Sequence, residues 1–217
     1  LEQIFAQADQ AVNDAAARVD RPKATASMAA IVVAGAYAYV ASIGNVRVCL
    51  YRGGSLRQLT EDHSLAMLRF RQGGRTRAQL GRDALSRKLY RSLGSGGDVD
   101  PDTFELELAD GDVILVCTDG IHSNVEEKVV ETSFRDRNLG VVADDLLSKA
   151  LVGGTGETAS LLMLSVREPR AATEVDELTR TLGEVFLFQK PPPTERLIPS
   201  RQENCEKTRW RQRPWPS

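Results

Sequence analysis

Histidine, cysteine and net charge are all scarce in this chain of 217 residues. Its two histidines, His63 and His122, exclude any chemistry that needs three histidine side chains. Its three widely spaced cysteines exclude a disulfide framework and a four-cysteine zinc site. The 28 basic and 30 acidic side chains give a formal net charge of −2. That balance excludes a globally basic nucleic-acid binder and an acidic disordered chain.

One uncharged segment is long enough to span a bilayer, namely residues 24–46. The segment is rich in Ala, Gly, Ser and Thr, and its apolar run stops at Gly35. Tyr37 and Tyr39 then alternate with small residues, which indicates two buried strands joined by a turn. We therefore expect no membrane segment in this part of the chain.

The cysteines indicate the compartment. Cys49 and Cys117 lie in apolar runs, so both are expected to be reduced thiols in the core. Reduced thiols favour a cytoplasmic location. The first residue is Leu1 rather than Met, so the sequence leaves open whether native residues precede it.

Hydrophobic periodicity predicts an alternation of helices and strands. Apolar residues recur at helical spacing in some segments and at every second position, or in unbroken runs, in others. The expected helices cover residues 1–19, 64–72, 75–82, 125–134 and 139–151. The expected strands cover residues 29–34, 37–43, 46–52, 55–59, 88–93, 103–108, 113–117 and 161–166.

The links between these strands predict the fold class. Hairpin-type links dominate, which favours an antiparallel α+β fold with two sheets over a parallel sheet. We expect residues 1–168 to form one domain and residues 169–190 to add one more helix. Residues 191–217 are rich in proline and arginine, and they cannot bury enough apolar surface to fold, so we expect a disordered tail.

A strand that ends in an acid is the first candidate for chemistry. Residues 113–117 form an unbroken apolar run, which is typical of a central strand, and Asp119 and Gly120 follow directly after Thr118. A carboxylate at the end of such a strand is a common ligand of Mg²⁺ or Mn²⁺. On spacing alone, however, a capping role for Asp119 is favoured over a metal role.

A hairpin and a short polar segment supply weaker candidates. Asn45 lies at the predicted hairpin turn and suits a backbone with positive φ, whatever its function. Arg47 is expected to support the loop or to pair with a nearby acid. Further along, Asp62 or Ser64 is expected to cap a helix. His63 between them has no evident catalytic partner, so we expect it to be structural.

A glycine-rich segment at residues 153–158 superficially resembles a phosphate-binding loop. It lacks the lysine that such a loop requires, and Glu157 would repel a phosphate. It also follows a helix and precedes a strand, which is the reverse of the usual order. The segment is therefore not interpreted as a phosphate-binding loop.

Taken in order, these segments resemble the PPM-type metal-dependent protein serine/threonine phosphatases, also called protein phosphatase type 2C. The resemblance spans roughly residues 1–167, and the ordered set is more specific than any single motif. The family's early Asp-Gly-x-Gly motif has no counterpart, so the chain resembles a divergent, N-terminally incomplete member. The matching segments are residues 40–54, 58–64, 86–102, 106–120 and 153–166.

The resemblance implies a four-layer αββα sandwich with a two-metal centre at one edge. In this family Mn²⁺ or Mg²⁺ activates a water molecule that attacks phosphoserine or phosphothreonine. Asp119 matches the aspartate of the family's Ser-Asp-Gly motif. Asn45 stands where the family has the acid of Gly-Asp-Ser-Arg, and Glu157 stands at the family's late Asp-Asn pair. The resemblance assigns loop support to Gly44, Arg47 and Gly120.

These departures lead to two functional hypotheses. Two divalent cations repel each other and need several anionic ligands, and this chain supplies one clear carboxylate. The first hypothesis is a phosphatase domain with impaired hydrolysis of phosphoserine and phosphothreonine. The second is a catalytically inactive phosphatase-like module that binds a phosphoprotein, a protein kinase or another regulator. Neither hypothesis includes a nucleic acid or a membrane as partner.

Overall fold

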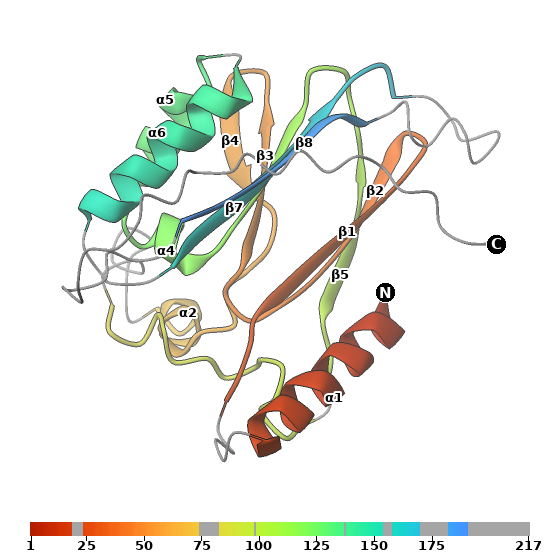
Figure 1. The fold of residues 1–217 in the computed structure, drawn as a ribbon, viewed down its shortest axis with the longest axis vertical. Coiled ribbons are helices and arrows are strands. Elements are labelled where there is room, and N and C mark those ends of the chain that lie inside the picture. The colour runs from red at the N-terminus through yellow and green to blue at the C-terminus, as the bar shows by residue number, and fades with distance from the viewer. Residues whose placement is uncertain are drawn as a thin grey trace, which may run out of the picture.

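The chain folds into two antiparallel sheets with helices on their outer faces (Figure 1). The computed structural model describes residues 1–18, 24–73, 83–97, 99–136, 138–153, 158–169 and 182–190. The helices are α1 (Glu2–Arg18), α2 (Leu65–Arg71), α4 (Asp119–His122), α5 (Glu127–Ser133) and α6 (Leu139–Val152). The strands are β1 (Met28–Ala34), β2 (Tyr37–Ile43), β3 (Arg47–Arg52), β4 (Ser55–Gln58), β5 (Asp102–Glu107), β6 (Val113–Cys117), β7 (Ala159–Val166) and β8 (Leu182–Lys190).

Each sheet contains a hairpin of consecutive strands, β1–β2 in one sheet and β3–β4 in the other. One sheet has the order β1-β2-β5, and the other has the order β4-β3-β6-β7-β8. All the pairs in both sheets are antiparallel. The predicted α+β class with two antiparallel sheets is therefore confirmed, and the uncharged segment at residues 24–46 forms the β1–β2 hairpin.

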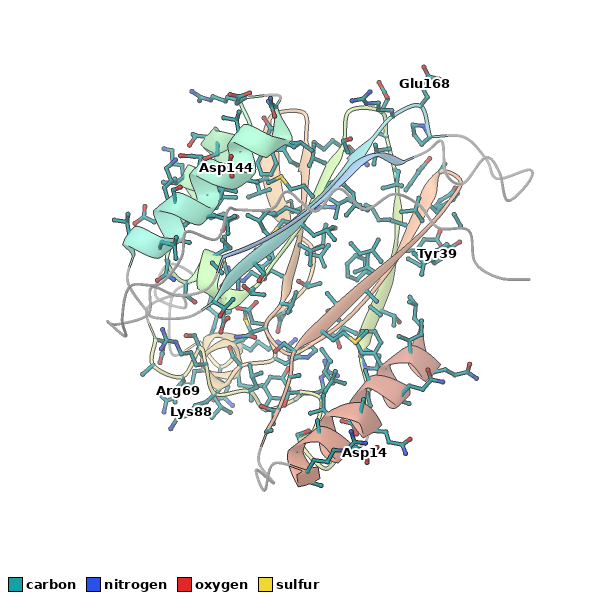
Figure 2. The ribbon with its side chains drawn as sticks, in the orientation of Figure 1. Asp14, Tyr39, Arg69, Lys88, Asp144 and Glu168 are labelled. Atoms are coloured by element: carbon teal, nitrogen blue, oxygen red, sulfur yellow. The ribbon has the colours of Figure 1, made fainter. Side chains whose placement is uncertain are left out.

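The core between the sheets follows from the period of two along the strands. Phe104 and Leu106 of β5 point inward and pack with residues of β3, β6 and β7. Tyr37 and Tyr39 of β2 point outward and are 40% and 39% exposed, and Figure 2 shows Tyr39 on the outer side of its strand. The alternation of side chains thus separates the buried face of the three-stranded sheet from its outer face.

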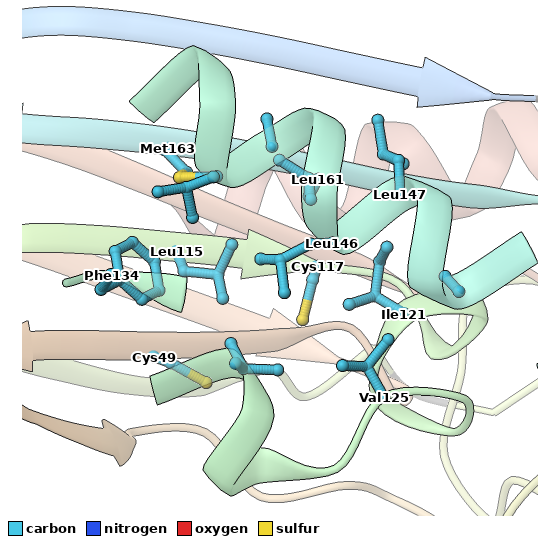
Figure 3. Packing of buried hydrophobic residues seen from close by; sticks show 14 of the residues in the cluster. Cys49, Leu115, Cys117, Ile121, Val125, Phe134, Leu146, Leu147, Leu161 and Met163 are labelled. Atoms are coloured by element: carbon cyan, nitrogen blue, oxygen red, sulfur yellow. The ribbon is translucent and has the colours of Figure 1, made fainter. Parts of the chain in front are cut away.

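Helices cover the opposite faces of the two sheets. Leu146 and Leu147 of α6 pack against Cys49, Leu115 and Cys117 on the outer face of the five-stranded sheet (Figure 3). The helix α1 packs on the other sheet through Phe5 and its neighbours. The four layers α, β, β and α stack in that order (Figure 1), as the family resemblance implies.

Some sequence predictions fail or fall outside the described residues. Residues 88–93 do not form a strand, because only isolated bridges join Leu89 to Ser64 and Leu93 to Ala26. The helix expected within residues 169–190 is wrong over Leu182–Lys190, which pairs with β7 as β8. The helix expected at residues 75–82 and the tail expected at residues 191–217 lie outside the described residues. The single domain expected over residues 1–168 stays a prediction.

Two predictions about the compartment can be compared with the structure. Cys49 and Cys117 are buried thiols, as expected. Among the described residues no helix is long and apolar enough to cross a membrane. The cytoplasmic location stays a prediction.

The close contact of α4 with β7 is testable at Gly120. A Cβ at this position would lie 2.5 Å from the carbonyl oxygen of Thr158 and 2.9 Å from the Cα of Ala159. Because both neighbours are backbone atoms, Gly120→Ala should lower the free energy of unfolding by about 2 kcal/mol. Gly97→Ala is the matched control, since a Cβ there meets nothing within 4 Å. Equal urea midpoints for the two variants would contradict this packing.

Candidate functional site

The end of strand β6 fixes the position of Asp119. Thr118 follows the strand in an extended conformation and is the N-cap of α4, and Asp119 is the first residue of that helix. The Thr118 amide donates to the carbonyl of Ser160 (3.0 Å), and the Ser160 amide donates to Oγ1 of Thr118 (3.1 Å). These bonds tie the start of α4 to β7. The half-buried Asp119 carboxylate is therefore held at the edge of the five-stranded sheet.

Asn45 meets Asp119 at this edge. Nδ2 of Asn45 donates to Oδ2 of Asp119 over 3.1 Å. The hydroxyl of Ser27 donates to Oδ1 of Asn45 (2.9 Å), and its oxygen accepts the Asn45 backbone amide (3.2 Å). Ser27 thus fixes the orientation of the Asn45 amide, with the N–H groups facing Asp119. The structure brings together two of the three residues that the sequence suggested as metal positions.

Glycine at position 44 makes this arrangement possible. Gly44 has φ +92°, and a Cβ there would lie 2.1 Å from Oγ of Ser27. The prediction that Asn45 takes the positive φ is wrong, because Gly44 takes it instead. Gly44 also exchanges two bonds with His63: the His63 amide donates to its carbonyl (2.8 Å), and its own amide donates to Nδ1 of His63 (3.1 Å).

His63 connects the Gly44–Asn45 turn to strand β5 of the three-stranded sheet. Its Nε2 lies 3.0 Å from Oδ2 of Asp102, the first residue of β5. Arg91 pairs with the same carboxylate. Burial alone would raise the pKa of Asp102, but the hydrogen bonds and charges of His63 and Arg91 outweigh it and lower that pKa. His63 therefore contacts an acid that is 39 residues away in the sequence.

Arg47 forms an ion pair with Asp62, so the nearby acid that the sequence did not identify is Asp62. Its Nε and Nη2 donate to the two carboxylate oxygens of Asp62 at 2.9 and 2.6 Å. Burial alone would raise the pKa of Asp62, but the hydrogen bonds and charge of Arg47 hold that pKa below its usual value. This two-point pair joins the start of β3 to the segment that leads into α2, so it supports the loop beside the site.

His122 is the residue of this region that the sequence reasoning missed. Its Nε2 donates to the carbonyl oxygen of Asn45 (2.9 Å), and its buried Nδ1 has no hydrogen-bond partner among the described residues. Burial lowers the pKa of His122 to about 4, and the positive charge of Arg47 acts in the same direction. His122 lies three residues after Asp119, which is about one helical turn. This spacing was the signal in the sequence that could have placed the two side chains on the same face.

The described residues do not fit a two-metal centre. Among the described residues, Asp119 is the one carboxylate hydrogen-bonded to Asn45, and the Asn45 amide presents an N–H donor to it rather than an oxygen ligand. Within the described part of the chain, no group of three or more His, Cys, Asp or Glu side chains could hold an ion. Glu157, the other suggested ligand, lies outside the described residues.

A cavity of about 40 Å³ lies beside Arg47. Its walls are mainly apolar and come from β3, β4, β6, α4 and α5, with Arg47, Cys117 and His122 among them. Neither Asp119 nor Asn45 lines it. The cavity is therefore separate from the Asp119 edge.

Known phosphatases are similar to this chain in sequence and in fold. No family model matches the chain. The serine/threonine phosphatase stp of Listeria welshimeri is 31% identical over 139 residues, which are 64% of this chain and 55% of that protein. The chain thus spans about half the length of this curated relative.

Solved structures show the same architecture. The PPM Ser-Thr phosphatase MsPP of Mycobacterium smegmatis matches with a TM-score of 0.66 and 25% identity, over 73% of this chain and 69% of that one. The catalytic domain of the phosphatase PstP, solved with two manganese ions, matches with a TM-score of 0.62 and 22% identity, over 71% and 64%. The two-sheet sandwich with an edge site is the architecture of a metal-dependent phosphatase domain. In sequence and in fold the chain is similar to the PPM-type protein serine/threonine phosphatases.

The contact between Asn45 and Asp119 predicts the behaviour of Asn45→Asp. Two adjacent carboxylates repel each other, so in the presence of a chelator this variant should have a lower melting temperature than wild type. The free energy of unfolding should fall by about 1–2 kcal/mol. Mn²⁺ added at ten to a hundred times its dissociation constant should restore about 1–3 kcal/mol to the variant. Thermal unfolding with and without Mn²⁺ measures both effects.

The matched control is Asn138→Asp at the exposed N-cap of α6, which makes the same chemical change away from Asp119. The wild type and this control should show little shift with Mn²⁺. If Asn45→Asp is as stable as wild type in chelator and does not respond to Mn²⁺, the contact with Asp119 is not a close electrostatic one.

The lowered pKa of His122 predicts that the stability of the chain depends on pH. Its pKa is about 4 in the folded chain, against an ordinary value of 6.5. As the pH falls from 6.5 to 4 the unfolded chain takes up a proton that the folded chain does not, so the free energy of unfolding decreases by roughly 2–3 kcal/mol. Urea unfolding at several pH values measures the slope. His122→Gln keeps a donor for Asn45 but does not titrate, so its profile should be flatter over this range, and identical slopes would contradict the assignment.

Proposed function

We propose that this chain acts on phosphoserine- and phosphothreonine-containing proteins as a phosphatase domain with impaired hydrolysis. Similarity to the serine/threonine phosphatase stp supports the substrate class. The position of Asp119 at the end of β6 supports the location of the site. The observation that carries the impairment is the 3.1 Å hydrogen bond from the neutral amide of Asn45 to Asp119.

The low negative charge at the Asp119 edge is the physical reason to expect impaired hydrolysis. A divalent cation is attracted by anionic oxygens, and a second cation nearby adds repulsion that further carboxylates must offset. Asp119 is the principal candidate ligand for Mn²⁺ or Mg²⁺, and Glu157 and Asn45 are the weaker ones. Asn45 lowers the negative charge at the edge and occupies one oxygen of Asp119, so we expect weak binding of either metal.

A second function has its own support. The Asn45 amide satisfies Asp119 without any cation, and Ser27 holds that amide in place through two hydrogen bonds. An edge satisfied in this way stays folded in the absence of metal. The chain would then be a regulatory module that binds a phosphoprotein, a protein kinase or another regulator without hydrolysing it. A cytoplasmic location suits both functions.

Hydrolysis of a phosphothreonine peptide in Mn²⁺ separates the two functions. The impaired enzyme should show slow hydrolysis that depends on Mn²⁺, and Asp119→Ala should lower its rate about tenfold or more. Asp144→Ala is the control, because Asp144 is an exposed acid on α6 (Figure 2). No hydrolysis above the Asp119→Ala background, together with measurable binding of the peptide, would favour the regulatory module. Hydrolysis that Asp119→Ala leaves unchanged would contradict the proposed site.

A further inference from the structure

Positive charge is concentrated in one stretch of an almost neutral chain. Residues 67–91 contain eight Lys and Arg side chains and one Asp, a local charge of +7. Because the whole chain carries −2, the remaining residues together carry −9. Such a separation of charge creates a field that attracts partners of one sign to one region.

The fold gathers the described part of this charge on one surface. The helix α2 lies beside residues 85–88, because the amide of Leu65 donates to the carbonyl of Lys88 (2.8 Å) and that of Ala66 to Leu85 (3.3 Å). Figure 2 shows the Arg69 and Lys88 side chains at the same end of the molecule. Four exposed cations form what we call the basic surface: Arg69, Arg71, Arg87 and Lys88.

Acidic side chains border the basic surface. Arg71 pairs with Glu61 over 2.6 Å, and the side chains are 55% and 36% exposed. A pair this exposed contributes little and leaves Arg71 able to exchange partners. Asp100, whose side chain is 83% exposed, pairs with Arg91 over 3.4 Å. Within the part of the chain that the structure describes, the basic surface is thus a patch of positive charge bordered by acids.

A chain of contacts links the basic surface to the candidate site. Ser64 is the N-cap of α2, and it follows His63 directly. His63 holds Gly44, which precedes Asn45, and Asn45 contacts Asp119. In Figure 1 the helix α2 lies next to the end of the sandwich that carries α4. A partner on the basic surface therefore lies near the Asp119 edge.

We infer that the basic surface binds the acidic flank of a phosphorylated protein segment. The inference rests on the proposed function, which supplies the phosphoprotein, and adds a preference for Asp and Glu beside the phosphorylated residue. Opposite charges speed association and select the partner more than they strengthen the contact. A short acidic peptide fits a patch bordered by acids. A nucleic acid would need cations along an extended backbone.

Fluorescence anisotropy of labelled phosphothreonine peptides tests this inference. One peptide carries Asp and Glu around the phosphothreonine, and the other carries Ser and Gln. The acidic peptide should bind about tenfold more tightly at low salt. Arg69→Glu combined with Lys88→Glu should remove that preference. The neutral pair Arg69→Gln and Lys88→Gln should weaken it about threefold, and this milder pair guards against a folding defect in the first.

The control combines Lys128→Glu with Arg135→Glu, which changes the net charge equally at exposed positions around α5. This control should keep the preference. Equal binding of the two peptides, equal losses in the basic-surface and control variants, or equally tight binding of a single-stranded oligonucleotide would overturn the inference. The readout is binding, so a preference that persists without hydrolysis supports the inference even if the catalytic proposal fails. Hydrolysis without any preference would leave the proposed function standing and remove the inference.

Discussion

An uncharged amide beside a half-buried carboxylate governs the edge of this sandwich. Charge-assisted hydrogen bonds of this kind are worth about 1.5–3 kcal/mol, and leaving a buried partner unsatisfied costs a similar amount. The Asn45–Asp119 bond is one of several that fix the turn, since Ser27, His63 and His122 bind Gly44 or Asn45 from other directions. The edge is therefore organised around a neutral residue.

The order of the motifs was readable from the sequence because it depends on local periodicity. The alternation in residues 103–108 and the unbroken apolar run in residues 113–117 identify a half-buried and a central strand, and β5 and β6 are those strands. The position of Asp119 after that apolar run identified the acid at the sheet edge. These inferences needed only short segments, in which side-chain pattern and burial are directly linked.

The remaining features depend on contacts between distant segments. His63 finds Asp102 across 39 residues, and no spacing rule connects them. The segment Leu182–Lys190 becomes a strand because β7 offers it an open edge, so sheet pairing overrides its local pattern. Residues 88–93 show the reverse case, because they lack a partner strand over most of their length. Three-dimensional pairing, rather than propensity, decides these segments.

The central claim is that this edge is satisfied without a cation, and calorimetric titration of the unmodified chain with Mn²⁺ tests it most directly. The account predicts no tight binding, with any heat fitting a dissociation constant of about a millimolar or weaker. Two ions bound per chain with micromolar affinity would contradict it, because Asn45 could not then be facing Asp119 as a donor.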